Sequence, residues 1–124
     1  MKSNCGTDII EVKRIENAIK SKKEKFLNKI YTPFEIKYCV SKKEMQYQHF
    51  AARFAAKEAI FKAISEILDD KYEINWTDIE IRNDKNGKPK AYFLNKGYKI
   101  KNIDISMSHI KDYATAMCIV EIGE

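Results

Sequence analysis

The segment that most constrains the fold of this chain runs from Glu44 to Leu68 and contains neither glycine nor proline. It is rich in alanine and phenylalanine, and its larger apolar residues recur at the spacing of one helix face. The residues on that face are Phe50, Phe54, Phe61, Ile64 and Leu68. The pattern predicts one long helix whose aromatic face packs against the core.

Three charged residues interrupt this predicted helix. Lys57 falls inside the aromatic face and Glu58 at its edge, while Glu58 and Lys62 are four residues apart and share a side of the helix. One interpretation is a surface ion pair, with Lys57 extending its ammonium group to solvent. The other is a carboxylate and an ammonium group at the mouth of a polar site, because an isolated buried charge is too costly without a partner or a metal ion.

Shorter elements are predicted before this helix. Residues 4–10 form an apolar run that indicates a strand, and residues 11–26 have the period of an amphipathic helix with a basic outer surface. In the segment Thr32–Glu35, the threonine can cap a helix, the proline suits its first position, and the glutamate completes a capping box. A short helix is therefore expected to end near Tyr38.

The second half of the chain shows the alternating pattern of β-strands, with a hairpin signal at Asn86–Gly87. The strands expected there cover residues 76–84, 91–94, 103–110 and 113–122. A strand, then helices, then antiparallel strands indicate an α+β fold. A chain of 124 residues fits a single domain, residues 1–124.

The chain carries a formal net charge of +5, which favours acidic partners such as nucleic acid, an anionic membrane, a phosphorylated small molecule or an acidic protein. Its basic residues are not interleaved with aromatic residues in the manner of single-stranded nucleic-acid binders. No segment approaches the ~20 apolar residues of a membrane span. We therefore expect neither nucleic acid nor membrane as partner. The lack of a signal peptide and the scattered cysteines predict a cytoplasmic protein with reduced thiols.

Two acidic residues are candidates for a metal site. Asp8 ends the predicted first strand and Glu58 lies on the long helix. Two carboxylates from separate elements, with positions left for water and phosphate oxygens, suit Mg²⁺. The alternative for Asp8 is a helix N-cap for a segment that begins near Ile9. His109 shares a strand face with apolar residues, where a histidine is either a core residue or a donor to a phosphate group.

Three segments, in this order, resemble one family. They are GTDIIEVKRI (Gly6–Ile15), FAARFAAKEAIFKAIS (Phe50–Ser65) and SMSHIKDYATAMCIVE (Ser106–Glu121), and the hairpin DIEIRNDKNGKPKAYF between them is similar as well. The match is colinear over nearly the whole chain. The chain thus resembles the holo-[acyl-carrier-protein] synthases, the small bacterial type of 4'-phosphopantetheinyl transferase.

The resemblance implies an activity and its partners. Members of the family transfer 4'-phosphopantetheine from coenzyme A to a serine of apo acyl carrier protein, for fatty-acid synthesis, and release adenosine 3',5'-bisphosphate. They depend on Mg²⁺ and form homotrimers whose active sites lie between subunits. Their first helix binds the acidic carrier protein.

The resemblance also implies roles for residues of this sequence. Asp8 and Glu58 would hold the metal, and Glu58, Lys62 and His109 would be catalytic. The residues implied at coenzyme A are Arg53, Lys62, Ser65, Asn86, Lys88, Pro89 and His109. Those implied at the carrier protein are Lys13, Arg14, Lys20, Lys22, Lys23 and Lys25.

One position departs from the family pattern. Ser65 stands where the family has a glycine and a Gly-rich turn, and no glycine follows until Gly87. The long helix is therefore expected to continue further, with the Ser65 hydroxyl replacing a backbone contact to phosphate. The base for the carrier serine stays open between Glu58, or a water it orients, and Glu35, which a capping-box role already explains.

Two other functions stay open on the sequence alone. One is a basic nucleic-acid-binding module, supported only by the positive charge. The other is a non-catalytic carrier-binding subunit that keeps the basic helix. The first needs no carboxylate at Asp8 or Glu58, and the second needs no Mg²⁺.

Overall fold

The computed structural model of the chain describes residues 2–69, 73–94 and 98–123. The strands and α-helices are β1 (Lys2–Glu11), α1 (Val12–Lys22), α2 (Glu24–Ile30), α3 (Pro33–Val40), α4 (Gln46–Ile64), β2 (Ile79–Asn83), β3 (Pro89–Phe93), β4 (Ile100–His109) and β5 (Tyr113–Ile122). Short 3-10 turns are η1 (Lys43–Met45), η2 (Ser65–Ile67) and η3 (Trp76–Asp78). The predicted α+β fold is confirmed.

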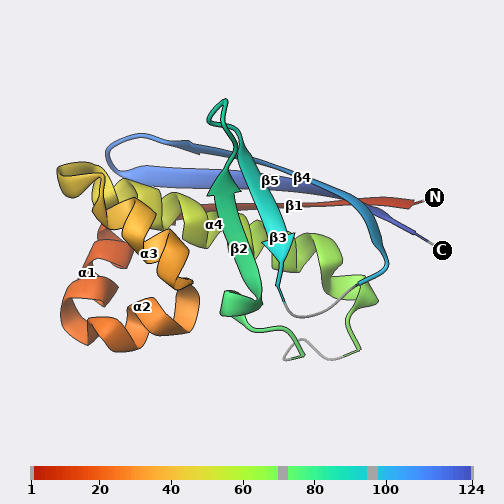
Figure 1. Cartoon of the computed structure of the whole chain (residues 1–124), viewed down its shortest axis with the longest axis horizontal. Helices are drawn as coiled ribbons and strands as arrows, with labels where there is room; N and C mark the ends of the chain where they lie inside the picture. The colour runs from red at the N-terminus through yellow and green to blue at the C-terminus, as the bar shows by residue number, and fades with distance from the viewer. Residues whose placement is uncertain (1, 70–72, 95–97, 124) are drawn as a thin grey trace.

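The long helix α4 lies between two β-elements. Strands β1, β5 and β4 form an antiparallel sheet with β5 in the middle, and β2 and β3 form a separate hairpin. Figure 1 shows α4 running along the sheet, the hairpin crossing it, and α1 to α3 gathered at one end of the molecule. The core therefore surrounds α4 instead of lying on one side of it.

This enclosure changes which face of α4 is most buried. Phe50 and Ile64 are fully buried as expected, but Phe54 and Phe61 are only partly buried. Five alanines are buried as deeply as Phe50 and Ile64, at 1% exposed or less, namely Ala51, Ala55, Ala56, Ala59 and Ala63. Small side chains let the helix backbone approach the sheet closely, so the predicted aromatic core face is wrong in detail.

Both long helical predictions end earlier in the structure than expected. The helix α4 begins at Gln46 and ends at Ile64, and a 3-10 turn begins at Ser65, so replacement of the family glycine does not prolong the helix. The helix expected over residues 11–26 is broken at Lys23, whose φ of 52° is incompatible with an α-helix. The break turns α2 to a new direction and shapes the surface described below.

The shorter elements agree more closely with expectation. The capping box of Thr32 and Glu35 is present, with Pro33 at the start of α3. The hairpin turn has Gly87 at a φ of 84°, and the return strand begins at Pro89, two positions before the predicted start. Cys5, Cys39 and Cys118 are free thiols, as expected. Among the described residues, no helix combines the length and apolar character needed to cross a bilayer.

Candidate active site

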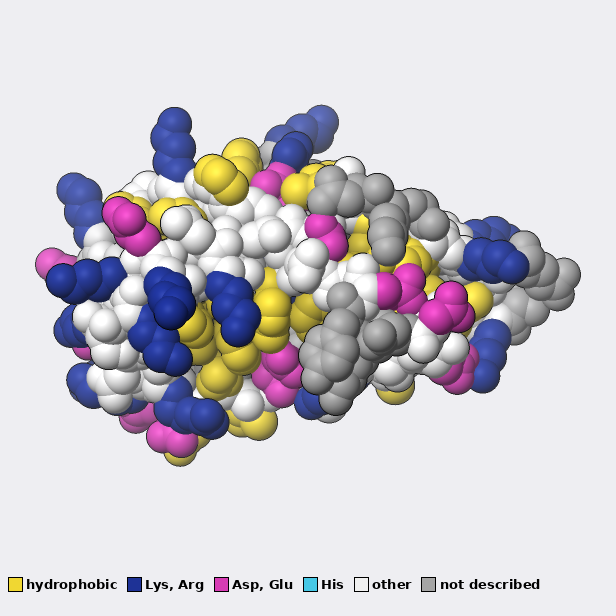
Figure 2. Space-filling model, turned by 90° about the horizontal axis from the view of Figure 1, so that it is seen from below, with side chains coloured by type: hydrophobic (Ala, Val, Ile, Leu, Met, Phe, Trp, Pro, Cys, Tyr) yellow, Lys and Arg dark blue, Asp and Glu magenta, His cyan; other side chains and the backbone are white. Residues whose placement is uncertain are grey.

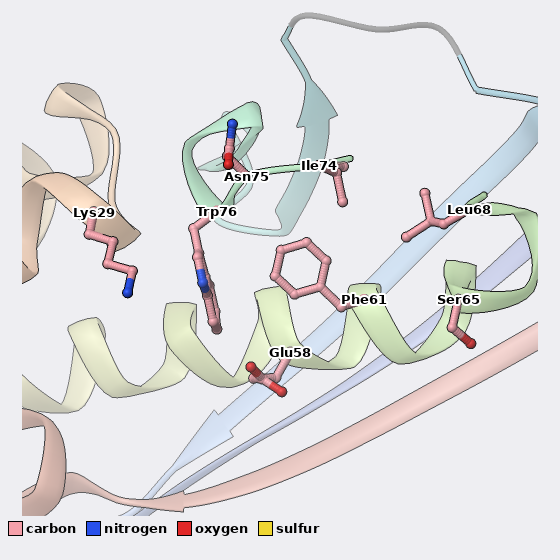
Figure 3. Close-up of a pocket in the computed structure, with 8 residues that line it drawn as sticks. All are labelled: Lys29, Glu58, Phe61, Ser65, Leu68, Ile74, Asn75 and Trp76. Atoms are coloured by element: carbon pink, nitrogen blue, oxygen red, sulfur yellow. The ribbon is translucent and has the colours of Figure 1, made fainter. Parts of the chain in front are cut away.

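A pocket of about 520 Å³ opens beside the second half of α4. Its walls come from α2, α4, the turn η2 and the segment that leads into η3. The lining residues are Lys29, Glu58, Phe61, Ser65, Leu68, Ile74, Asn75 and Trp76. Figure 3 shows the Phe61 and Trp76 rings meeting over α4, with the Glu58 carboxylate below them and the Lys29 side chain extending toward Trp76.

Aromatic rings give the pocket a firm apolar wall. The Trp76 ring stacks on Phe54 at 4.9 Å between centroids and meets Phe61 edge-on at 5.0 Å. Such contacts stabilise ring orientation beyond simple burial. The pocket therefore combines a rigid apolar side with a single carboxylate and a lysine, a combination that suits an amphipathic ligand.

Asp8, Glu58 and Lys62 form a charged cluster at the edge of this pocket. The Lys62 Nζ donates to the Thr7 carbonyl at 2.9 Å and to Asp8 Oδ1 at 3.2 Å. Burial raises the pKa of Glu58, the negative charge of Asp8 raises it further, and Lys62 opposes both. Asp8 lies within β1 and α1 starts only at Val12, so the N-cap alternative for Asp8 is wrong.

The donor set of Asp8 and Glu58 fits Mg²⁺. The described residues contain no group of three or more His, Cys, Asp and Glu side chains able to hold a metal ion. Two carboxylates alone match a cation that keeps several positions for water and phosphate oxygens. Burial is the main cause of the raised pKa of Glu58, and the negative charge of Asp8 adds to it; a divalent cation bound between the two carboxylates would oppose both effects.

Lys57 and Glu35 form a fully buried ion pair, with both side chains 0% exposed and 2.7 Å between Lys57 Nζ and Glu35 Oε1. The idea that Lys57 reaches solvent is therefore wrong. Glu35 also accepts hydrogen bonds from the amides of Thr32 and Ile81, at 2.8 and 2.7 Å. An enclosed carboxylate with these partners cannot meet a serine from another protein, which removes Glu35 as a candidate base.

His109 and Arg53 lie in a second cluster, outside the pocket of Glu58. His109 meets the ring of His49 at 5.3 Å, and the Arg53 guanidinium lies 4.3 Å from the centre of the Tyr38 ring. Burial, assisted by Arg53, lowers the pKa of His49 to about 4. Arg53 is 2% exposed, and its Nε has no hydrogen-bond partner among the described residues. Its contact with coenzyme A stays a prediction.

The other predicted coenzyme A residues divide between two places. Ser65 lines the pocket, and its hydroxyl donates to the Lys62 carbonyl at 3.1 Å. Asn86, Lys88 and Pro89 instead lie at the end of the β2–β3 hairpin, where Lys88 pairs with Asp104 at 2.9 Å. These three residues do not line the pocket of Glu58, so one chain does not bring all the predicted residues together.

The predicted carrier-protein residues form an exposed basic surface on α1 and α2. Glu16 pairs with Lys20 at 2.6 Å and with Lys13 at 3.7 Å, while Arg14 is exposed. A groove at the α1–α2 junction is lined by Ser21, Lys22, Lys25, Phe26, Lys29 and Ile30. Figure 2 shows basic side chains around hydrophobic ones at this end of the molecule.

Several residues of the site were not anticipated. Lys29 borders both the groove and the pocket of Glu58, and Trp76 and Asn75 form a pocket wall. The sole tryptophan of the chain, at the first position of the strand predicted over residues 76–84, was a usable signal for Trp76. Lys29 offered none, because its position depends on the break at Lys23. His49 was likewise hidden among the helical residues.

The chain is similar to known proteins over almost its whole length. Residues 4–118 match the model of the 4'-phosphopantetheinyl transferase superfamily. Holo-[acyl-carrier-protein] synthase of Ruminiclostridium cellulolyticum is 39% identical, with 100% of this chain and 96% of the relative covered. That of Chlamydia caviae is 43% identical, with 97% and 98% covered.

Solved structures are similar over the same length. The holo-(acyl-carrier-protein) synthase of Bacillus anthracis, in complex with coenzyme A (3',5'-ADP), has a TM-score of 0.81 and 34% identity, with 97% of this chain and 96% of that chain covered. The Helicobacter pylori enzyme in complex with coenzyme A has a TM-score of 0.78 and 31% identity, with 94% and 99% covered. The chain therefore belongs to the holo-[acyl-carrier-protein] synthase family, within the 4'-phosphopantetheinyl transferase superfamily.

Proposed function

We propose that the protein transfers 4'-phosphopantetheine from coenzyme A to a serine of apo acyl carrier protein, with Mg²⁺, in support of fatty-acid synthesis. The serine oxygen attacks the β-phosphorus of coenzyme A, and the phosphorus–oxygen bond to the nucleotide breaks. Adenosine 3',5'-bisphosphate leaves, and the serine proton passes to a base. The observation that carries this proposal is the cluster of Asp8, Glu58 and Lys62 at a partly apolar pocket.

The charged cluster supplies what phosphoryl transfer needs. Asp8 and Glu58 would hold Mg²⁺, which neutralises phosphate charge when bound. Lys62 is 53% exposed and hence available to a phosphate group, with the Ser65 hydroxyl nearby. Charge neutralisation and positioning account for most of the catalysis of phosphoryl transfer. Glu58, or a water that it orients, takes the serine proton.

The apolar side of the pocket suits the pantetheine arm of coenzyme A. That arm is an uncharged chain with amide groups, and the Phe61 and Trp76 rings offer it a flat surface beside Glu58. Coenzyme A is bound in the solved relatives of Bacillus anthracis and Helicobacter pylori, which supports the same co-substrate here. The basic surface of α1 and α2 then receives the acidic carrier protein.

A homotrimer explains why the predicted residues are divided on one chain. Asp8 is on β1 and His109 on β4, the two edges of the sheet, with β5 between them. The outer face of this sheet also exposes large apolar side chains, namely Ile9, Tyr113, Met117 and Ile119. An exposed apolar face of this kind is typical of subunit contacts. Contact between copies would bring His109 and Arg53 of one subunit toward Glu58 of the next.

The test is a transfer assay with a mass readout. Purified protein, apo acyl carrier protein, coenzyme A and Mg²⁺ are incubated together, and intact masses are measured with and without EDTA. A mass gain of one phosphopantetheine that EDTA abolishes supports both the transfer and its dependence on a divalent cation. Carrier binding without any mass gain would instead favour a non-catalytic subunit, and a gain that resists EDTA would remove the metal from the proposal.

A further inference from the structure

Both members of the Lys57–Glu35 ion pair have several hydrogen-bond partners. The Lys57 Nζ donates to Glu35 Oε1 at 2.7 Å, to the Ile30 carbonyl at 2.7 Å and to the Trp76 carbonyl at 3.0 Å. An ammonium group has three donors, so each one has a partner. Neither side chain lines the pocket or can meet a ligand directly.

The partners of this pair include residues next to or within two of the pocket walls. Ile30 ends α2 and follows Lys29, which lines the pocket, and Trp76 belongs to η3 and lines it as well. Through its second oxygen, Glu35 holds the amide of Ile81 in β2. Lys57 itself precedes Glu58 on α4. One ion pair thus joins α2, α3, η3 and β2 to the helix that carries the acidic residue.

Burial of this ion pair costs free energy, and a contribution to the stability of the fold does not account for that cost. Burial lowers the pKa of Lys57, which shows that desolvation of the ammonium group outweighs the help from Glu35. Well-packed apolar side chains commonly replace a buried ion pair without loss of stability. A charged pair at this place is therefore better explained by the geometry that its directional hydrogen bonds impose.

We propose that Lys57 and Glu35 are positioning residues that hold the Lys29 and Trp76 walls of the pocket at the spacing coenzyme A requires. The catalytic part of this inference rests on the proposed function, whereas the placement of Trp76 does not. The pair acts through the backbone carbonyls of Ile30 and Trp76. Loss of both charges together should loosen the pocket while leaving the fold intact.

The experiment compares a single variant, a double variant and a matched control. Lys57→Met leaves the Glu35 carboxylate buried without its partner and should be strongly destabilised. Lys57→Met combined with Glu35→Gln removes both charges and should regain most of the melting temperature. The control, Lys2→Met with Glu66→Gln, makes the same chemical change in an exposed pair with 2.8 Å between charged atoms.

Two readouts are taken on the folded double variant. Trp76 is the only tryptophan, so its fluorescence, excited beyond tyrosine absorption, reports on one pocket wall without any substrate. We expect stronger acrylamide quenching than in the wild type, and a fall of about tenfold in kcat/KM for coenzyme A, mainly through KM. Wild-type quenching and kinetics in a stable double variant would overturn the inference.

A measurement on the unaltered protein covers the case in which neither variant folds. The amides of Thr32 and Ile81 both donate to Glu35. If the ion pair holds these segments together, both amides become open to deuterium exchange in the same opening step. The free energy of opening then has the same dependence on denaturant concentration for the two amides. Separate opening of the two segments would overturn the inference. If quenching changes but wild-type protein does not modify the carrier, the positioning holds and the proposed function fails.

Discussion

Gly6 of β1 and Ala59 of α4 are in direct backbone contact, because a methyl group at position 6 would lie 2.0 Å from the Ala59 carbonyl oxygen. No side chain fits between the strand and the helix at this point. Asp8 follows Gly6 by two residues, and Glu58 immediately precedes Ala59. The close approach of the two backbones therefore sets the separation of the two carboxylates proposed to hold Mg²⁺.

Substitution of Gly6 by alanine should damage both the fold and the site. The added methyl group meets backbone atoms that cannot move aside, so we expect a loss of about 3 kcal/mol in the free energy of unfolding, the upper end for overpacking. Urea denaturation measures it. Gly123→Ala is the control, since its nearest neighbour would be 3.8 Å away, and its effect should stay within about 0.5 kcal/mol. An equally stable Gly6→Ala protein would contradict the contact.

Glu58→Gln should give a folded protein that is inactive yet more stable at neutral pH. The pKa of Glu58 is higher in the folded chain than its ordinary value of 4.5, so its charged form costs stability. The full cost applies at pH values above the pKa of Glu58 in the folded chain, and it vanishes at pH values below the pKa of Glu58 in the unfolded chain. Urea unfolding of wild type and variant across this range should show a gain at neutral pH that disappears in acid.

The same titration links Glu58 to the metal. Protonation of Glu58 removes one of two carboxylates, so Mg²⁺ affinity should begin to fall at a higher pH than for an ordinary glutamate. Calorimetric titration with Mg²⁺ at several pH values measures this. Glu58→Gln should lose the pH dependence together with the affinity. A normal transfer rate of Glu58→Gln at saturating Mg²⁺ would refute both parts.

Arg14→Ala should weaken binding of the carrier protein without changing affinity for coenzyme A. Arg14 is exposed on α1 and no intramolecular salt bridge holds it among the described residues, so it is available to an acidic partner. We expect an increase of about fivefold in the carrier Kd, about 1 kcal/mol, that shrinks at high salt. Titration with each ligand separately tests this. Lys101→Ala, on the exposed side of β4, is the control, and an unchanged carrier affinity for Arg14→Ala would disprove the role.

The sequence identified the local elements well because their signals are local. The capping box of Thr32 and Glu35 and the hairpin at Gly87 depend on side chains within a few residues of each other. The pairing of Asp8 with Glu58 was proposed from their residue types and supported by the family resemblance, and the structure adds the ion pair of Asp8 with Lys62. The capping box and the hairpin turn need no knowledge of long-range packing, whereas the contact of Asp8 with Lys62 joins distant parts of the chain.

The features that were not predicted from the sequence depend on tertiary packing. Lys57 sits in an apolar arc, and nothing nearby in the sequence shows that Glu35 and two carbonyl groups meet it there. The alanine face of α4 lies in the core because β-elements lie on two sides of the helix. The apolar period of the helix sequence does not show that the helix is covered on two sides. The break at Lys23 likewise carries no glycine or proline signal.

Subunit complementation should show whether the active site lies between copies of the chain. Glu58→Gln and His109→Ala each disable one of the two clusters, which lie on different elements of a single chain. If a site takes Glu58 from one subunit and His109 from its neighbour, co-refolding the two inactive variants restores about a quarter of the wild-type sites in a random mixture.

The control is a mixture of Glu58→Gln with Asp8→Asn. Both residues belong to the same cluster in one chain, so in this pairing every subunit carries a defective metal site and no mixture should recover activity. Recovery in the first mixture but not in the second places the site between subunits. If neither mixture gains activity while light scattering still gives the mass of a trimer, the trimer stands, and His109 serves its own subunit.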